Sequence, residues 1–213
     1  MKRQPRLILS LLSAALIAYP IGMLWSQGVS EAELGKQLLD LNASNRFDEA
    51  QELALGYLRE EPDAGELLYG FVKDLVENHD QFERAIAIID KTLPALEEAD
   101  PNWGARVVEE RGIAIVFGRY KQTGDKNDLA EAKSDFQHSV QLEPSMSEAH
   151  FHLGVINAIE GDVAESKASF QKAIETSANP DITAAMREWV AMAEQNPQEF
   201  CRMMRTFYST SNQ

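Results

Sequence analysis

Residues 129–144 read LAEAKSDFQHSVQLEP, and residues 163–174 read VAESKASFQKAI. The second stretch repeats the first 34 residues later, with Phe170 matching Phe136 and Ser166 standing where the first copy has Ala132. A fixed period of 34 residues is the length of a helix–turn–helix unit that buries its apolar face only by stacking on copies of itself. The repetition therefore predicts an all-α solenoid.

The residues between the two copies sharpen this prediction. Leu153-Gly154 is followed seven residues later by Gly161-Asp162, then by an aromatic residue at Phe170, a small residue at Ala173 and a late proline at Pro180. In this order the chain resembles the tetratricopeptide-repeat family. The resemblance implies a right-handed helical solenoid that binds other proteins and carries no catalytic residues, so we expect no enzyme activity.

The same register extends towards the N-terminus. Residues 46–50 (RFDEA) and 81–85 (QFERA) both fit the start of a second helix, 35 residues apart, and Gly112 fits the first-helix glycine of another unit. We therefore expect a solenoid over residues 26–180 with about four helix pairs, at residues 31–63, 66–102, 103–145 and 147–180. The spacing from Ala85 to Ala132 exceeds one period by 13 residues. Most of these extra residues fall at 120–128 (YKQTGDKND), which we predict to be a long polar turn that contacts a partner; a solvated insertion without a role is the alternative.

The start of the chain predicts a membrane anchor. Residues 1–6 form a basic tail with Lys2, Arg3 and Arg6, and residues 7–25 contain no charged side chain. A helix of that length nearly spans the ~30 Å hydrocarbon core of a bilayer. No pair of small residues lies at a suitable distance before Ser26 for cleavage, so we expect an uncleaved signal anchor. A cleaved secretory signal is the alternative.

Orientation and compartment follow from the same residues. Under the positive-inside rule the basic tail stays in the cytoplasm and the rest of the chain is exported. A single-span chain without low-complexity tails suits a bacterium. We therefore expect a single-pass protein of the bacterial inner (cytoplasmic) membrane, with its N-terminus cytoplasmic and its repeats periplasmic.

Charge and composition exclude several function classes. The chain carries 34 acidic and 20 basic residues, for a formal net charge of −14. Nucleic acids and anionic lipid headgroups are bound through basic patches, so neither is an expected partner of the exported part. His150 and His152 point apart on a helix and cannot share a metal. The sequence also lacks a phosphate-binding loop and a haem-attachment motif, so we expect no catalytic residue, metal, cofactor or small-molecule substrate.

The resemblance implies that a partner lies along the concave face formed by the first helix of each unit. Gly35 and Leu39 stand where the family's clamp for a chaperone tail begins with Lys and Asn, which argues against that kind of partner. The apolar stripe in the C-terminal half instead fits a helix or a hydrophobic strip. The alternative is that the chain's own C-terminal helices cover Phe151 and Ile159. The predicted partner-binding groove consists of Arg106, Glu109, Ile113, Val116 and Phe117 in the third unit and Phe151, Val155, Ala158 and Ile159 in the fourth.

Two further helices are predicted in residues 181–213. Asn179-Pro180 and Asn196-Pro197 each match a helix start, with an Asn cap followed by Pro at the first helical position. The first helix caps the solenoid. The second carries a Met- and Phe-rich face, which we predict to dock on a partner or the membrane; a second cap is the alternative. This C-terminal docking face consists of Phe200, Met203, Met204 and Phe207. The lone Cys201 beside it is expected to be a buried thiol.

The sequence thus favours a non-catalytic scaffold, anchored in the membrane, that assists the assembly of a membrane or periplasmic protein complex. The alternative is a permanent accessory subunit of a multi-subunit membrane complex of the respiratory, photosynthetic or secretion type. In both cases the partners are proteins, and the N-terminal helix holds the chain in the membrane.

Overall fold

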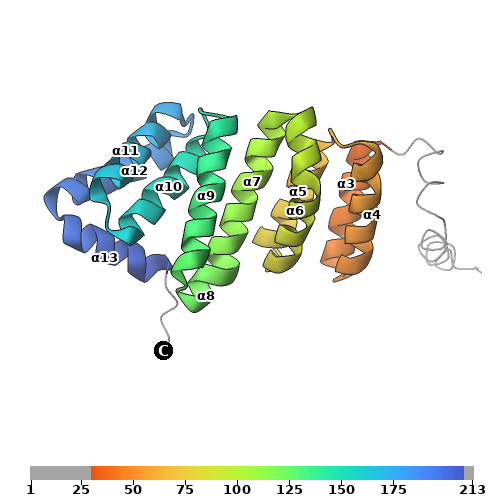
Figure 1. Cartoon of the computed structure of the whole chain (residues 1–213), viewed down its shortest axis with the longest axis horizontal. Helices are drawn as coiled ribbons and strands as arrows, with labels where there is room; N and C mark the ends of the chain where they lie inside the picture. The colour runs from red at the N-terminus through yellow and green to blue at the C-terminus, as the bar shows by residue number, and fades with distance from the viewer. Residues whose placement is uncertain (1–29, 209–213) are drawn as a thin grey trace, which may run out of the picture.

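The structure is a computed structural model that describes residues 30–208. The predicted basic tail and membrane anchor, residues 1–25, lie outside this range. All secondary structure between residues 30 and 208 is helical, and the helices stand side by side along the long axis of the molecule (Figure 1). The prediction of an all-α solenoid is confirmed. Between Ser30 and Tyr208 no helix combines the length and the hydropathy needed to cross a membrane.

The described helices form successive pairs, and each pair consists of a first and a second helix. The second helix of a pair packs on its own partner and on the first helix of the next pair: α6 packs on α5 and α7, α9 on α7 and α10, and α11 on α10 and α12. The elements are α3 Glu31–Ala43, α4 Phe47–Glu60, α5 Gly65–Glu77, α6 Phe82–Ala99, α7 Pro101–Ile115, the π-helical turn η3 Val116–Tyr120, α8 Lys121–Thr123, α9 Lys126–Leu142, α10 Ser147–Glu160, α11 Val163–Thr176, α12 Pro180–Gln195 and α13 Pro197–Tyr208.

The repeated residues are the ones that bring paired helices together. A Cβ atom on Gly112 would lie 2.8 Å from the Phe136 ring, and one on Gly154 would lie 2.8 Å from the Phe170 ring. Both phenylalanines are completely buried. Ser166, which stands where the first copy has Ala132, is also buried and donates a hydrogen bond to the Gly154 carbonyl oxygen at 2.7 Å. The 34-residue repeat is therefore a repeated helix–helix contact.

The extra residues before α9 lengthen a helix, and the prediction of a long polar turn over residues 120–128 is wrong. The first helix of this pair continues through η3 and α8 to Thr123, and the turn itself is only Gly124 and Asp125. Gly124 has a φ of 68°, and the Asp125 side chain accepts a hydrogen bond from the Asn127 amide to start α9. The π-helical turn absorbs residues out of register with the α-helix, and it leaves Tyr120 buried.

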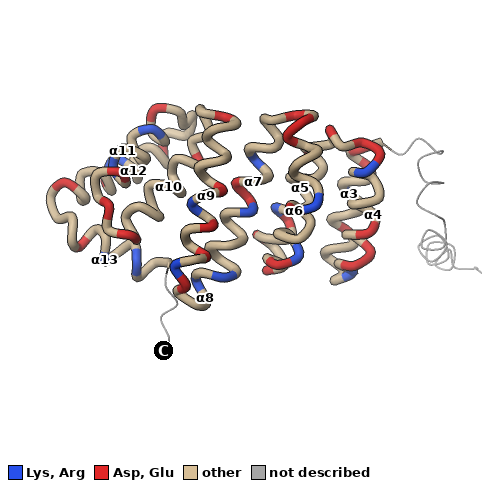
Figure 2. Tube along the Cα trace, in the orientation of Figure 1, with Lys and Arg blue, Asp and Glu red and all other residues tan. Residues whose placement is uncertain are grey.

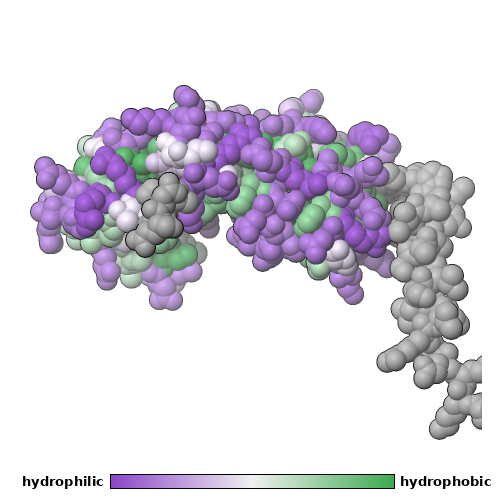
Figure 3. Space-filling view, turned by 90° about the horizontal axis from the view of Figure 1, so that it is seen from below, coloured by the Kyte–Doolittle hydropathy of each residue, from purple (hydrophilic) through white to green (hydrophobic). Residues whose placement is uncertain are grey.

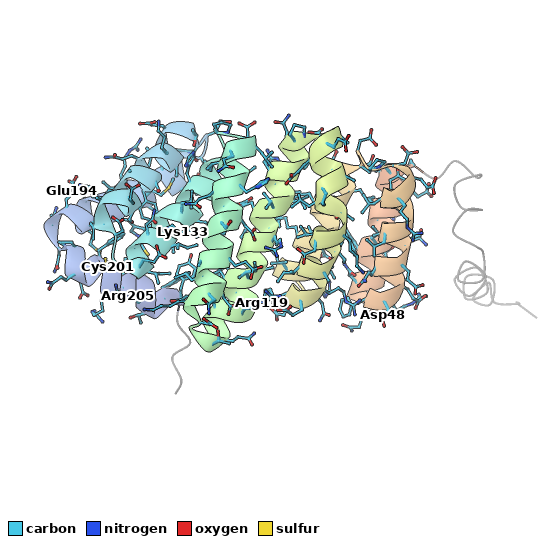
Figure 4. The ribbon with its side chains drawn as sticks, in the orientation of Figure 1. Asp48, Arg119, Lys133, Glu194, Cys201 and Arg205 are labelled. Atoms are coloured by element: carbon cyan, nitrogen blue, oxygen red, sulfur yellow. The ribbon has the colours of Figure 1, made fainter. Side chains whose placement is uncertain are left out.

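Ion pairs join each helix pair to its neighbour. Acidic and basic side chains are spread over the whole solenoid (Figure 2), so such pairs form at many places on its surface. Exposed pairs of this kind each contribute about 1 kcal/mol or less. The pairs between consecutive units are Arg84–Asp48 at 2.8 Å, Arg119–Glu83 at 2.6 Å, Lys133–Glu160 at 2.6 Å and Lys167–Glu194 at 2.8 Å (Figure 4).

Candidate partner-binding surface

A cavity of about 560 Å³ lies between α10 and α12, and we refer to it as the α10–α12 pocket. Most of its large side chains are apolar or aromatic. Seen from below, apolar patches lie among hydrophilic side chains on both halves of the molecule (Figure 3). The pocket is lined by Ser147, Glu148, Phe151, His152, Ser177, Ala178, Asn179, Ile182, Ala185, Met186 and Trp189.

Local sequence explains how α12 forms its side of the pocket. The Asn179 side chain accepts hydrogen bonds from the amides of Asp181 and Ile182, at 3.0 and 3.3 Å, so the helix begins at Pro180. From this start Ile182, Met186 and Trp189 follow at i, i+4 and i+7 and share one face. Met186 is buried, Trp189 is half-buried and Ile182 is 50% exposed. The pocket therefore has a packed floor and an exposed apolar rim.

Aromatic packing holds this floor in place. The Phe151 ring lies 5.6 Å from the Trp189 ring and 5.9 Å from the Phe170 ring, measured between centroids. Phe170 in turn contacts Trp189 at 5.6 Å in an edge-to-face arrangement. These distances lie in the favourable range for aromatic pairs. Helices α10, α11 and α12 thus share one aromatic cluster, and the pocket that it supports is preformed.

Two adjacent carboxyl groups on α7, Glu109 and Glu110, are buried, and Glu109 lies next to the pocket-lining His152. Glu109 Oε1 is 3.8 Å from His152 Nε2, and the His152 ring stacks on Phe136 at 4.7 Å. Burial raises the pKa of Glu109 to about 8, and the neighbouring Glu110 and Glu148 add to the shift. Burial also lowers the pKa of His152 to about 4. Both groups are therefore mainly uncharged at neutral pH, and their contact is not a salt bridge under those conditions.

The adjacent Glu110 faces away from α10 and towards α5, the first helix of the preceding pair. Its Oε1 lies 3.5 Å from Lys73 Nζ, which also contacts Glu77 Oε1 at 3.0 Å. Burial raises the pKa of Glu110 to about 7 in spite of the opposing charge of Lys73. Lys73 and Glu110 thus connect α5 to α7 through a partly buried contact.

Comparison with known proteins identifies the architecture. Residues 147–180 match the family model for the tetratricopeptide repeat, over the same residues that the sequence analysis assigns to the fourth unit. The structure also resembles the crystal structure of TTC0263, a thermophilic TPR protein of Thermus thermophilus, with a TM-score of 0.50 and 20% sequence identity. That match covers 84% of this chain and 97% of the other. The chain therefore contains a tetratricopeptide repeat at residues 147–180, within a helical solenoid of the same fold as that protein.

A curated relative matches part of this tetratricopeptide-repeat protein. A stretch of 99 residues is 30% identical to the human protein O-mannosyl-transferase TMTC1. The stretch covers 46% of this chain but only 10% of the transferase, so the chain corresponds to about a tenth of the length of that relative. Repeats of this family generally mediate contacts between proteins, and the fold suggests an interaction scaffold.

The tetratricopeptide-repeat fold places the predicted groove residues in two environments. Phe151 lines the α10–α12 pocket, Arg106 is exposed, and Ile113 and Phe117 are half-buried. A partner contact by these four residues stays a prediction. The other five are buried, so they do not line an open groove in this structure: Glu109, Val116, Val155, Ala158 and Ile159.

The predicted docking face on α13 needs a similar correction. Phe200 and Met204 are buried and Met203 is half-buried, because α13 packs on α10 and α12; Phe207 alone of the four is largely exposed, at 70%. The face is therefore used mostly within the chain. Cys201 is a free thiol and is buried, as expected.

Sequence reasoning missed the contribution of α12 to the candidate surface. The sequence analysis predicts only a capping role for this helix as a whole, which contains Ile182, Met186 and Trp189. Their i, i+4, i+7 spacing after an Asn-Pro helix start was the available signal, but spacing does not show which neighbour such a face meets. In the structure this face meets Phe151 of α10 and leaves a cavity between the two helices.

Proposed function

We propose that this tetratricopeptide-repeat protein is a non-catalytic scaffold that holds an apolar segment of a partner protein in the α10–α12 pocket. One observation carries the proposal: Ile182 is 50% exposed at the rim of a preformed cavity whose walls are Phe151 and Trp189. A cavity of about 560 Å³ has room for large apolar side chains. An amphipathic helix or hydrophobic strip supplies such side chains.

The setting that we propose for this scaffold is the bacterial inner membrane. Residues 7–25 would form the anchor, the basic tail would stay in the cytoplasm and the repeats would lie in the periplasm. The uncharged stretch of residues 7–25 and the basic residues before it support this arrangement. There the protein would assist the assembly of a membrane or periplasmic complex.

The pocket is tested by Ile182→Asp in the full chain. Because Ile182 is half exposed, we expect the melting temperature to change little. Burying an Ile side chain is worth about 1.5–3 kcal/mol, so partner affinity should fall by roughly 10- to 100-fold. The measurement is co-purification of the partner after mild detergent extraction, with affinity determined once the partner is identified by mass spectrometry.

Ala184→Asp is the matched control, because Ala184 is exposed on the same helix but does not line the pocket. The proposal requires that Ile182→Asp loses the partner while Ala184→Asp keeps it. Equal binding by both variants would show that the partner uses another surface. The same extraction also distinguishes a permanent subunit of a complex from a transient assembly factor. A permanent subunit co-purifies with its partner in a fixed ratio, and a transient assembly factor does not.

The membrane setting is tested independently of the pocket. A phosphatase reporter fused after Gln213 should be active because it is exported, and replacement of Lys2, Arg3 and Arg6 by Glu should reduce that activity. Cytoplasmic location of the unmodified fusion would contradict the periplasmic proposal. It would leave the pocket assignment untouched.

A further inference from the structure

Helix α13 does not continue the stacking pattern of the solenoid. Each earlier second helix from α6 onward packs on its own partner and on the first helix of the following pair. Helix α13 packs on its own partner, α12, and turns back on α10, the first helix of the preceding pair (Figure 1). Because α11 already packs on both α10 and α12, α13 lies against a different side of these two helices.

The contacts of α13 lie near the C-terminal end of α10. Arg205 Nε donates a hydrogen bond to the Ile159 carbonyl oxygen at 2.7 Å, a bond that satisfies one of the free carbonyls in the last turn of α10. The Tyr208 ring lies 5.8 Å from the Phe117 ring of η3. Arg205 and Cys201 both lie on the part of α13 beneath α10 (Figure 4). Phe117 and Ile159 belong to the predicted groove, so α13 occupies one end of that surface.

Other observations show that α13 fits this position incompletely. Its described part, Pro197–Tyr208, has 12 residues, and an isolated helix of that length is marginal in water. Phe207 remains 70% exposed beside Tyr208. A cavity of about 460 Å³ remains next to Arg205 and extends to Tyr120 and Leu129. A single residue, Asn196, separates α13 from α12, and its side chain accepts a hydrogen bond from the Glu199 amide at the start of α13.

We propose that the end of the groove beneath α13 is a docking surface for an amphipathic helix, and that α13 is its resident, displaceable occupant. The partner is a helix with the chemistry of α13. It presents large apolar side chains at i, i+4 and i+8, as Phe200, Met204 and Tyr208 do, and a cation that reaches the carbonyls at the end of α10. A longer helix than α13 would also fill the cavity beside Arg205. The inference goes beyond the proposed function, because the surface beneath α13 lies at the end of α10 and is separate from the α10–α12 pocket.

The test uses a peptide of the chain itself, so its outcome does not depend on the identity of any partner. A fluorescent peptide of residues 196–213 is titrated into the full chain in mild detergent. In the wild-type chain α13 competes for the surface, and binding is weak. In the Arg205→Ala chain the hydrogen bond to Ile159 is lost. A hydrogen bond from a charged donor is worth about 1.5–3 kcal/mol, so the peptide should bind at least about tenfold more tightly.

Arg202→Ala is the matched control, because Arg202 pairs with Glu199 on α13 itself. That chain should bind the peptide as weakly as the wild type, and a peptide carrying Arg205→Ala should lose its affinity for the Arg205→Ala chain. Equal binding by the Arg205→Ala and Arg202→Ala chains, or no binding by either, would overturn the proposal.

Hydrogen exchange provides a second test, which uses the unmodified chain and needs no variant. We expect the α13 amides to exchange at least tenfold faster than those of α10, because α13 opens without unfolding the solenoid. Equal protection of the two helices would make α13 an integral part of the core and would overturn the proposal. Loss of partner binding in the Ile182→Asp experiment bears only on the α10–α12 pocket, so the two failures are distinguishable.

Discussion

The two halves of the solenoid use their inner surfaces differently. In the N-terminal half a cavity of about 550 Å³ lies between α3 and α5, lined in part by Gly35, Leu39 and Gly70, and Leu39 is 44% exposed. In the C-terminal half the corresponding positions of α10 are buried from Val155 onward, and α13 packs there. The half with the stronger repeat motif thus keeps an open inner surface only at the start of α10, in the α10–α12 pocket, and covers the end of that helix.

This difference shows what the motif encodes. The contact between paired helices contains Gly154, Phe170 and Ala173. In such a close-packed contact, adding or removing a single methyl group changes the stability of the protein. The inner surface lies on another side of the first helices and has no such constraint. A strong motif therefore predicts the packing of a unit, and it does not predict whether the inner surface of that unit is open.

The largest expected contrast between the halves is in core truncation. Phe170→Ala removes a fully buried ring that contacts Phe151, Trp189 and Phe200, and it should reduce the free energy of unfolding by about 3–5 kcal/mol. Leu39→Ala, at an exposed inner position, should change it by about 0.5 kcal/mol or less. Urea unfolding followed by circular dichroism measures both. A large loss for Leu39→Ala would mean that the N-terminal inner surface is not open.

A smaller contrast, with opposite signs, is expected for two glycines. A Cβ on Gly154 would lie 2.8 Å from the buried Phe170 ring, so Gly154→Ala should destabilise the protein by about 1–3 kcal/mol. A Cβ on Gly70 meets nothing within 4 Å, and Ala is favoured over Gly inside a helix by about 0.8–1.0 kcal/mol. Gly70→Ala should therefore raise the unfolding midpoint. The same sign for both variants would contradict the comparison.

The smallest expected effect is a pH dependence confined to the C-terminal half. The pKa of Glu109 is raised by burial from 4.5 to about 8, so the stabilisation present at acid pH is lost as the pH rises from about 5 towards 8. Around Glu109 lie Arg106 and Glu110 on α7, Lys73 on α5, and Glu148 and His152 on α10. Glu109→Gln should flatten the decline of the melting temperature between pH 5 and 8.5.

Two features sharpen this experiment. Glu110, with a pKa raised to about 7, titrates in the same range, so part of the decline should persist in Glu109→Gln. Glu66→Gln is the control in the N-terminal half, because Glu66 is exposed at the rim of the cavity between α3 and α5. An unchanged slope in Glu109→Gln, or an equal flattening in Glu66→Gln, would show that burial of Glu109 does not set the pH response.

The 34-residue period was sufficient to predict the helical solenoid, because a helix pair of that length has to stack in order to bury its apolar face. The helix starts at Pro180 and Pro197 were likewise readable, since an Asn cap and a first-turn proline act within a few residues. The extra residues at 120–128 were misread as a turn. Their polar composition is compatible with a helix whose one buried side chain, Tyr120, faces the core.

The sequence by itself determined which residues join helices into pairs, because those contacts are local and recur at a fixed spacing. Only the tertiary structure decided which apolar faces remain open. Ile182 and Ile159 are both apolar residues on amphipathic helices, yet one is half exposed at a pocket and the other is 6% exposed beneath α13. The physical reason is that burial depends on what lies across from a face. For Ile159 that neighbour is Arg205, 46 residues further along the chain, brought there by the single-residue turn at Asn196.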